Sequence, residues 1–274
     1  MTTATLPSTA LPSTLRLGLA RGGVEVRQFF RQREQVVFTF TFPAIILVLL
    51  GSIFDDSYGP GVRVGQVFAA SMIAAGIVST SFVNLGISVA LDREDGTLKR
   101  LRGTPIPASA YFVGKVVLVA VASAAEAVVL LAVGMLMFDV SLPADAGRWF
   151  TFAWVAVLSI ASCSLLGIAI SAIARSAQSA AAVVNLPYIA LQFMSGVYIP
   201  ISGLPEWMRD VGALFPIKWA AQGFRSVFLP DSIMVREAAG SWELGKTALV
   251  LGGWCVLGLV LCLLTFRWTN RRAG

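Results

Sequence analysis

Apolar residues along this chain fall into six long runs that are separated by shorter polar segments. Each run is close to the roughly 20 apolar residues that an α-helix needs to cross a bilayer. The pattern therefore predicts an all-α integral membrane protein with six transmembrane helices, which form one membrane domain over residues 36–274. The predicted spans are Val36–Phe54, Val64–Leu91, Tyr111–Phe138, Trp149–Ile173, Ala180–Ile199 and Thr247–Phe266.

Two segments with different patterns precede the first run. Residues 1–14 are rich in Thr, Ser and Pro, which predicts a disordered tail. Residues 15–35 mix Arg with Leu, Val and Phe, as is typical of an amphipathic helix lying along the surface of an anionic membrane. A plain basic tail is the alternative for this second segment.

The composition confirms the membrane class and excludes several others. The chain is 57% hydrophobic and 13% charged, whereas soluble domains carry about 25% charged residues. It therefore lacks the polar residues that would coat a soluble core of this size. There is no His, and the cysteines lie inside apolar runs, so no imidazole base, disulfide framework or metal site is indicated. No nucleic-acid partner is expected.

The distribution of Lys and Arg predicts the orientation of the spans. Positive residues gather in cytoplasmic loops, and placing both termini in the cytoplasm puts about two thirds of the 21 basic residues on that side. The segments between the other span ends hold most of the acidic residues. The basic residues on the predicted cytoplasmic side are Arg16, Arg21, Arg27, Arg31, Arg33, Arg93, Lys99, Arg100, Arg102, Lys115, Arg175, Arg267, Arg271 and Arg272.

The densest cluster of charge lies between the second and third runs. Seven of the fifteen residues in Leu91–Pro105 are charged, so this segment belongs in water at a membrane face. Its acids come first and its bases follow, which suits the dipole of a short amphipathic helix. Glu94 or Asp95 lies at helical spacing from Lys99 and is expected to pair with it.

Two leucines, Leu98 and Leu101, would give this short helix an apolar edge that a groove in a partner protein could accept. Gly103 and Pro105 are expected to end the helix. A solvated loop with no partner is the alternative, because runs of charge are common on wet surfaces.

The polar segment Ser202–Gly245 on the predicted outer side is not a simple loop. Apolar and aromatic residues recur in it at helical spacing, and Pro205 and Pro216 interrupt the pattern. We expect short helices that dip into the outer leaflet or cap the bundle. A seventh span is the alternative, but the several charges in this segment make it costly.

One motif in this outer segment matches a phosphate-binding loop by its letters alone. Residues 240–247 (GSWELGKT) fit the pattern G-x-x-x-x-G-K-[ST]. That pattern binds phosphate only between a strand and a helix, whereas here a polar loop precedes it and a predicted span follows. We therefore expect Lys246 to lie at the start of a helix and to bind no nucleotide.

The segment Arg93–Leu101 (REDGTLKRL), followed by Thr104-Pro105 and then by Gly114-Lys115, resembles the signature of ABC-2 type transporter permeases. That family shows E-x-G-T, a basic–Leu step, a T-P turn and a G-K pair that opens the next span. An Arg-rich helix, a first span containing Phe38–Pro43 and six spans extend the resemblance over nearly the whole chain. The drug-resistance branch, which exports anthracycline-like antibiotics, is the most similar.

The resemblance implies the permease subunit of a bacterial ABC exporter in the cell (inner) membrane. Two permeases would pair as a homodimer or as related chains, in contact with membrane lipids, and each would bind a cytoplasmic ABC ATPase subunit. That subunit would hold ATP and Mg, so this chain would carry no cofactor, metal or catalytic residue while it exports an amphipathic drug-like or lipid-like substrate. The coupling helix would contact the ATPase through Arg93, Glu94, Asp95, Gly96, Thr97, Leu98, Lys99, Arg100, Leu101, Thr104 and Pro105.

Four polar side chains within the runs are candidates for lining a substrate path. An ionisable group in the middle of a span is costly and indicates function by default. Such a group could equally form a structural hydrogen bond with Gln178 or another neighbour, and polar packing between helices is the alternative for the amides. The candidates are Glu126, Asn185, Gln192 and Asn84.

Three other functional classes fit the sequence less well. An ATP-independent secondary transporter would need several ion-coupling groups in its spans, often arranged in repeated halves, and only Glu126 is available. A membrane enzyme would need clustered His, Asp or Cys residues at one face. A non-transporting membrane scaffold is compatible with the sequence.

Overall fold

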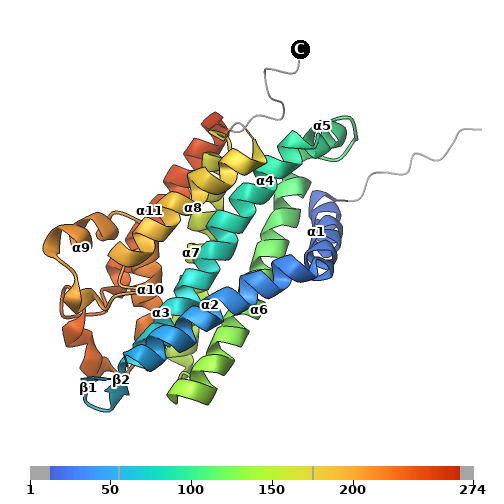
Figure 1. Ribbon diagram of the computed structural model, residues 1–274. Coiled ribbons are helices and arrows are strands. Elements are labelled where there is room, and N and C mark those ends of the chain that lie inside the picture. The colour runs from blue at the N-terminus through green and yellow to red at the C-terminus, as the bar shows by residue number, and fades with distance from the viewer. Residues whose placement is uncertain (1–12, 55, 175, 266–274) are drawn as a thin grey trace, which may run out of the picture.

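The protein is an all-helical bundle, with a single two-stranded hairpin in the part of the chain that is described (Figure 1). The computed structural model describes residues 13–54, 56–174 and 176–265. Most of the predicted tail, together with Arg175 and the basic residues after position 265, therefore lies outside the described residues. Five helical segments are long and apolar enough to cross a membrane. They are α2 (Arg33–Ile53), the continuous α3–η1–α4 segment (Val64–Glu94), α6 (Ala108–Phe138), α7 (Ala146–Ser171) and α11 (Leu244–Thr265).

The predicted fifth span corresponds to α8 (Ala177–Met194), which lies in the same bundle as the five long helices (Figure 1). Its 18 residues would measure about 27 Å at 1.5 Å per residue, and it contains Pro187 and several polar residues. It is shorter and more polar than the other five, so the count of six spans stays a prediction.

The second span is continuous but changes its winding in the middle. Helix α3 (Val64–Val78) passes through the π-helical turn η1 (Ser79–Asn84) into α4 (Leu85–Glu94). Nearly all of α3 is buried, because this span lies in the centre of the bundle, whereas α2 and α11 expose many apolar side chains. These exposed residues suit contact with lipid or with other apolar surfaces.

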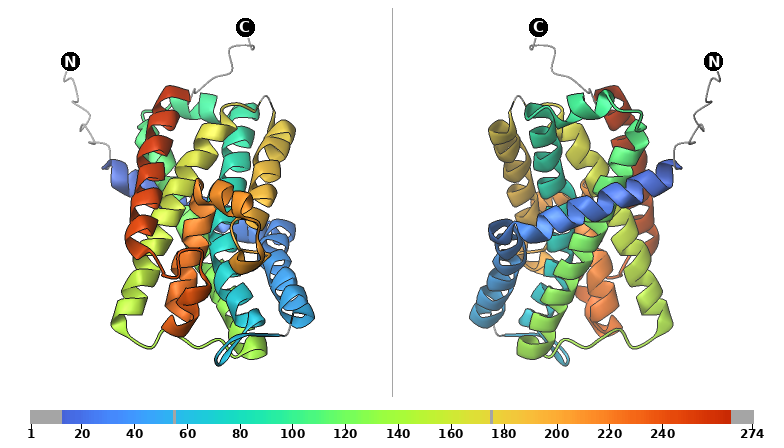
Figure 2. Two further views of the ribbon diagram at one scale, coloured as in Figure 1. Left: turned by 90° about the vertical axis from the view of Figure 1, so that its left-hand side faces the viewer. Right: turned by 90° about the vertical axis from the view of Figure 1, so that its right-hand side faces the viewer.

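The N-terminal helix lies outside the bundle. Helix α1 (Thr14–Arg31) crosses the outer face of α6 instead of running along it (Figure 2). Gly18 and Gly22 allow the close approach, because a Cβ atom at either position would come within 2.5–2.6 Å of Val113 or Val117. A helix was predicted for residues 15–35; Gln32 separates α1 from α2, so the first span begins earlier than expected.

Short helices connect α8 to α11, as the sequence indicated. They are η2 (Ile201–Gly203), α9 (Glu206–Ala213), α10 (Pro216–Phe228) and η3 (Asp231–Arg236). Pro205 directly precedes α9 and Pro216 opens α10, where a missing N–H costs nothing. Every residue of α10 is buried, because this helix enters the bundle between α3, α7 and α11. None of these four helices is long enough to cross a membrane.

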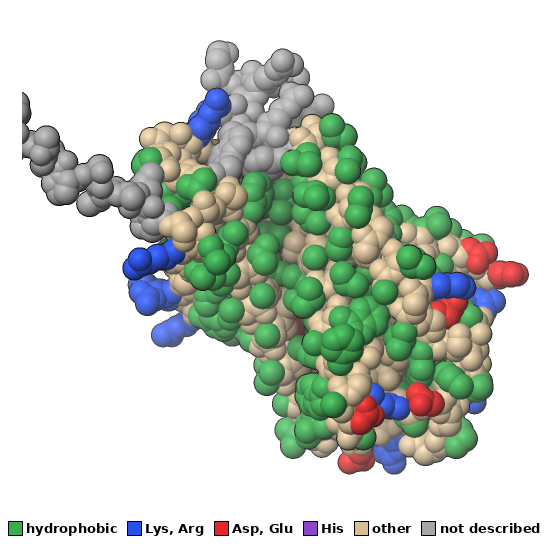
Figure 3. Space-filling model, turned by 180° about the vertical axis from the view of Figure 1, so that it is seen from behind, with side chains coloured by type: hydrophobic (Ala, Val, Ile, Leu, Met, Phe, Trp, Pro, Cys, Tyr) green, Lys and Arg blue, Asp and Glu red, His purple; other side chains and the backbone are tan. Residues whose placement is uncertain are grey.

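A small hairpin lies at the same end of the molecule as the start of α3. Its strands are β1 (Ser57–Gly59) and β2 (Val62–Arg63), which pair antiparallel. The turn between α4 and α6 lies at the opposite end, the same end at which the described part of α11 finishes (Figure 1). On the face seen in Figure 3, apolar side chains cover the middle, and acidic side chains appear only toward the end with the hairpin.

Candidate functional site at the turn between spans two and three

The charged segment forms two helices joined by a tight turn, and not one helix. Helix α4 ends at Glu94, and α5 comprises only Thr97–Arg102. Gly96 provides the turn with φ = 78°, in the left-handed region that glycine adopts readily. The prediction of one amphipathic helix with its acids at the start is therefore wrong, because Glu94 belongs to the preceding span.

Asp95 stabilises this turn by binding the start of α5. The backbone N–H of Thr97 donates to Oδ1 of Asp95 at 2.8 Å. Slight desolvation acts to raise the pKa of Asp95, but the hydrogen bonds from Thr97 outweigh it and leave that pKa below its ordinary value. Either Glu94 or Asp95 was expected to pair with Lys99; Asp95 accepts from Thr97 instead, while Arg100 donates to the Asp95 carbonyl at 3.5 Å.

Two residues predicted to contact an ATPase point into the protein. The guanidinium of Arg93 donates to the carbonyls of Ser171 and Ala174, at 2.6 and 2.8 Å, and so ties α4 to the end of α7. Leu98 is fully buried. The prediction that Leu98 gives a partner an apolar edge is wrong, because that side chain anchors α5 to its own chain.

The remaining predicted contact residues form a charged outer surface, which we call the elbow surface. Gly96, Thr97 and Leu101 are half-buried, and the others are exposed. Thr104 donates its hydroxyl to the carbonyl of Leu101 at 2.6 Å, which closes the last turn of α5. Arg102, which was not among the predicted contact residues, is exposed beside them and is included in the elbow surface. The exposed residues of the elbow surface are Glu94, Asp95, Lys99, Arg100, Arg102, Thr104 and Pro105.

A buried ionic cluster lies close to the elbow surface, and we call it the inner lock. Lys115 of α6 is 3% exposed, and its Nζ lies 2.8 Å from Glu25 of α1 and 2.7 Å from Asp92 of α4. The Tyr111 hydroxyl donates to the same Asp92 oxygen at 2.9 Å, and Arg21 pairs with Glu25 at 3.0 Å. The inner lock (Arg21, Glu25, Asp92, Tyr111 and Lys115) therefore joins three helices.

The inner lock was not predicted, although one feature of the sequence pointed to it. The sequence places Lys115 among the cytoplasmic basic residues and in the G-K pair, and it assigns no role to Glu25. Glu25 is the one acidic residue in α1, and it lies four residues after Arg21, where helical side chains meet. A lone acid on an otherwise basic helix was the available signal, but the distant Lys115 could not be paired with it from spacing.

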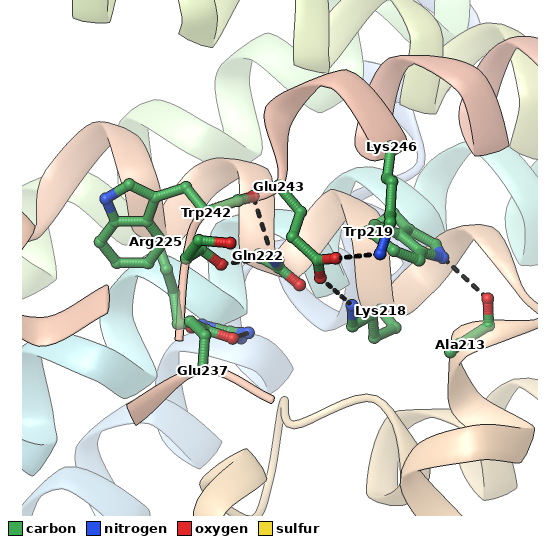
Figure 4. A network of polar contacts seen from close by, with 10 residues as sticks. Ala213, Lys218, Trp219, Gln222, Arg225, Glu237, Trp242, Glu243 and Lys246 are labelled. Carbon is green, nitrogen blue, oxygen red and sulfur yellow. Dashed lines mark hydrogen bonds and ion pairs between the residues drawn. The ribbon is translucent and has the colours of Figure 1, made fainter. Parts of the chain in front are cut away.

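A second buried ionic cluster holds α10 at the other end of the bundle (Figure 4). Arg225 of α10 is 2% exposed and makes a two-pronged contact with Glu237, at 2.5 and 2.8 Å. It also donates to Ser71 of α3 at 3.1 Å, and Gln222 donates to the carbonyl of Trp242 at 2.9 Å. We call Arg225, Glu237, Ser71 and Gln222 the outer lock.

The phosphate-loop look-alike joins this region to α11 and has a structural role. Lys246 pairs with Glu243 at 2.5 Å, and Lys218 of α10 lies 3.8 Å from the same carboxylate (Figure 4). Desolvation acts to raise the pKa of Glu243, but the two lysines outweigh it and lower that pKa. Loop and 3-10 turns, not a strand, precede this helix start, so the geometry lacks the strand that a phosphate loop requires.

The predicted path residues are not brought together as one site. Glu126 is buried in α6, and the Thr80 hydroxyl of η1 donates to its Oε2 at 2.7 Å. Asn185 donates to the Ala181 carbonyl of its own helix. Gln192 is buried in α8, and Asn84 is half-buried at the end of η1. Within the described chain, no hydrogen bond joins Glu126 to Asn84, Asn185 or Gln192; the partner is Thr80.

The family of the chain follows from its match to a family model. The model of the ABC-2 type transporter family matches residues 23–229, which is most of the chain. The chain belongs to the ABC-2 type transporter family. The match of this ABC-2 chain begins inside α1 and ends just after α10, so it contains the elbow surface, Glu25 and Lys115. Glu237 of the outer lock and helix α11 lie beyond it.

Relatives of this ABC-2 chain carry the names of transport permeases. The "Probable multidrug ABC transporter permease YbhR" of Escherichia coli K12 is 25% identical over 175 residues, which are 64% of this chain and 47% of YbhR. The chain thus spans about half the length of that relative. The transport permease YvfS of Bacillus subtilis 168 is 22% identical over 242 residues, 86% of this chain and 91% of YvfS.

A third relative comes from Porphyra purpurea. The transport permease ycf38 of Porphyra purpurea is 24% identical over 207 residues, which are 73% of this chain and 70% of ycf38. The family and the five long apolar helices together make this chain a multi-pass membrane protein of the ABC-2 type transporter family.

Proposed function

We propose that the chain is the permease subunit of an ATP-driven exporter, and that a separate cytoplasmic ABC ATPase subunit supplies the energy. That partner binds ATP and Mg. This chain provides the substrate path through the membrane and the helix α5 through which the motion of the partner is transmitted. The cargo is an amphipathic drug-like or lipid-like molecule. The name of YbhR, a multidrug transporter permease, supports a drug-like cargo but describes only that relative.

The observation that carries the proposal is the construction of the elbow surface. It is exposed and charged, yet it is rigidly mounted: Arg93 ties its base to α7, and buried Leu98 anchors α5. A short helix held in this way cannot move without moving the spans on either side of it. Such an element is suited to receive the motion of a partner, which a solvated loop could not transmit.

The inner lock determines which helices would follow that motion. Lys115 connects α6 to Asp92 of α4 and to Glu25 of α1, and α1 leads into the first span after the one-residue break at Gln32. A displacement of α5 therefore reaches three spans within a few residues. Alternating access follows when these spans tilt relative to the rest of the bundle.

The elbow surface faces the cytoplasm in this proposal, as do both termini, and the hairpin end faces outward. The positive-inside distribution supports this orientation. A second permease copy and membrane lipids cover the apolar side chains that α2 and α11 expose. The membrane is the bacterial inner membrane.

Transport in inverted membrane vesicles tests the function. Vesicles containing the permease and its ATPase subunit should accumulate a fluorescent amphipathic dye when ATP is added, and the detergent-extracted permease should co-purify with the ATPase. Vesicles with a hydrolysis-deficient ATPase subunit should accumulate none. Accumulation by the permease alone, driven by a proton or sodium gradient, would contradict the proposal and identify a secondary transporter.

A further inference from the structure

Glu126 occupies the middle of the membrane-spanning bundle. It lies about 16 Å along α6 from Lys115, at 1.5 Å per residue, and its partner Thr80 is near the midpoint of the Val64–Glu94 span. Among the described spans, it is the one acidic residue that lies away from a span end. Its side chain is 1% exposed, at the depth where a charge is most costly.

The carboxyl group of Glu126 is only half satisfied. Thr80 donates to Oε2, while Oε1 has no hydrogen-bond partner. The hydroxyl of Ser123, one turn earlier on the same helix, also lacks a partner. The other buried glutamates, Glu25 and Glu237, each face a cation. Since an unpaired buried polar atom costs free energy, helix packing alone does not account for Glu126.

The neighbouring span is shaped around this carboxyl group. A Cβ atom on Gly76 of α3 would lie 2.7 Å from Oε1 of Glu126, so the glycine leaves the space that the carboxyl occupies. Thr80 lies in the π-helical turn η1, and such turns occur frequently at functional sites. A glycine notch at Oε1, a positioned hydroxyl at Oε2 and an altered winding thus converge on one carboxyl group.

We propose that Glu126 binds the positively charged group of the cargo, and that the cargo is an amphipathic organic cation. This inference rests on the proposed transport function. In the conformation described, the carboxyl is enclosed between α3 and α6; the cation reaches Oε1 when these two helices separate during alternating access. Thr80 holds Oε2, so that Oε1 presents its charge to the ligand.

A pair of ions with matched size and opposite charge tests the site. Binding and ATP-dependent uptake of tetraphenylphosphonium and of tetraphenylborate are measured with the permease–ATPase complex. Glu126→Gln keeps the shape of the side chain and its bond from Thr80, and should weaken phosphonium binding by about tenfold or more, the scale expected for losing a buried charged partner. The binding and uptake of tetraphenylborate should not decrease. Glu126→Asp should retain part of the phosphonium binding.

Glu206→Gln, the same exchange at an exposed position of α9, serves as the matched control and should change neither ion. Unchanged phosphonium binding in Glu126→Gln, or a wild-type complex that does not bind this cation, overturns the cation site. Failure of the transport function itself looks different: no variant, including the wild type, would then move either ion when ATP is added.

Discussion

The inner and outer locks both bury a cation against carboxylates, but they connect the chain in different ways. Arg225 and Glu237 of the outer lock are twelve residues apart, and the lock mainly fastens one short helix and the loop that follows it. Lys115 of the inner lock meets Glu25, ninety positions earlier, and Asp92 on another span. The ion pair of the outer lock is therefore a local clamp, whereas the ion pairs of the inner lock join separate helices.

This difference suggests that the outer lock mainly stabilises the fold, whereas the inner lock mainly transmits motion between helices. Two hydrogen bonds to Glu237 and one to Ser71 fix the position of the Arg225 guanidinium. In the inner lock each carboxylate has a second partner, since Arg21 supports Glu25 and Tyr111 supports Asp92. Loss of one inner contact is thus partly compensated. We expect outer-lock variants to lose mainly stability and inner-lock variants to lose mainly coupling.

The largest expected effect is that of Glu237→Gln. It leaves Arg225 buried without its counter-charge, and breaking a buried pair in this way costs about 3–5 kcal/mol. The free energy of unfolding in a denaturing detergent titration measures the loss. The double variant Arg225→Met, Glu237→Met should recover much of it, because no charge is then buried alone. A single variant as stable as the wild type would contradict the clamp.

Lys115→Met comes next and should separate the two regions. The loss of its charged contacts is expected to cost about 1.5–3 kcal/mol, less than the outer-lock variant, because Arg21 and Tyr111 still support the two carboxylates. ATP hydrolysis by the assembled complex should continue while export falls. The measurement is the ratio of substrate exported to ATP hydrolysed. An unchanged ratio would show that the inner lock transmits nothing.

Asp95→Ala tests the turn that positions α5 above the inner lock. Removal of the hydrogen bond from Thr97 should cost about 0.5–1.5 kcal/mol locally, seen as faster hydrogen exchange of the Thr97 amide. The pKa of Asp95 is lowered in the folded chain, so this contribution is present above the ordinary value of about 3.9. It is lost as the pH falls through the lower folded value. Exchange that is unaffected by the substitution would contradict this role.

The smallest expected effect is that of Lys246→Ala, at the edge of the region that holds the outer lock. Its side chain is 67% exposed, and exposed pairs contribute about 0–1 kcal/mol. The midpoint of unfolding should hardly change, and ATP hydrolysis by the complex should be the same as in the wild type. A loss of nucleotide binding in this variant would instead indicate that residues 240–247 form a phosphate-binding loop.

The sequence predicted the helices better than it predicted their contacts. Apolar runs specified five spans within a few residues, since a bilayer imposes the length of each, and Pro205 and Pro216 marked the starts of α9 and α10. The inward direction of Arg93 could not be predicted, because it depends on where α7 ends in space. The burial of Leu98 depends on how α5 packs against the rest of the chain. The pairing of Glu25 with Lys115 requires α1 to cross α6, which no local pattern encodes.

At the candidate site, too, the sequence located the segment but did not predict which residues contact each other. The motif containing Glu94 and Thr97 located the elbow surface, but helical spacing misplaced the partner of Asp95, because Gly96 breaks the helix. Glu126 stood out by its charge alone, whereas Thr80 and Gly76 became its neighbours only through the packing of α3 against α6.

Charge reversal on the elbow surface tests most directly whether an external ATPase drives the bundle through α5. The measurement is ATP-dependent export by the permease–ATPase complex in lipid vesicles, comparing the wild type with Lys99→Glu, Arg102→Glu. Arg27→Glu, Arg31→Glu on the exposed side of α1 provides an equal change of charge as the control. We predict that the α5 variant keeps its unfolding midpoint but loses export, the ATPase subunit, or both, while the control retains them. Wild-type export by the α5 variant would contradict the account.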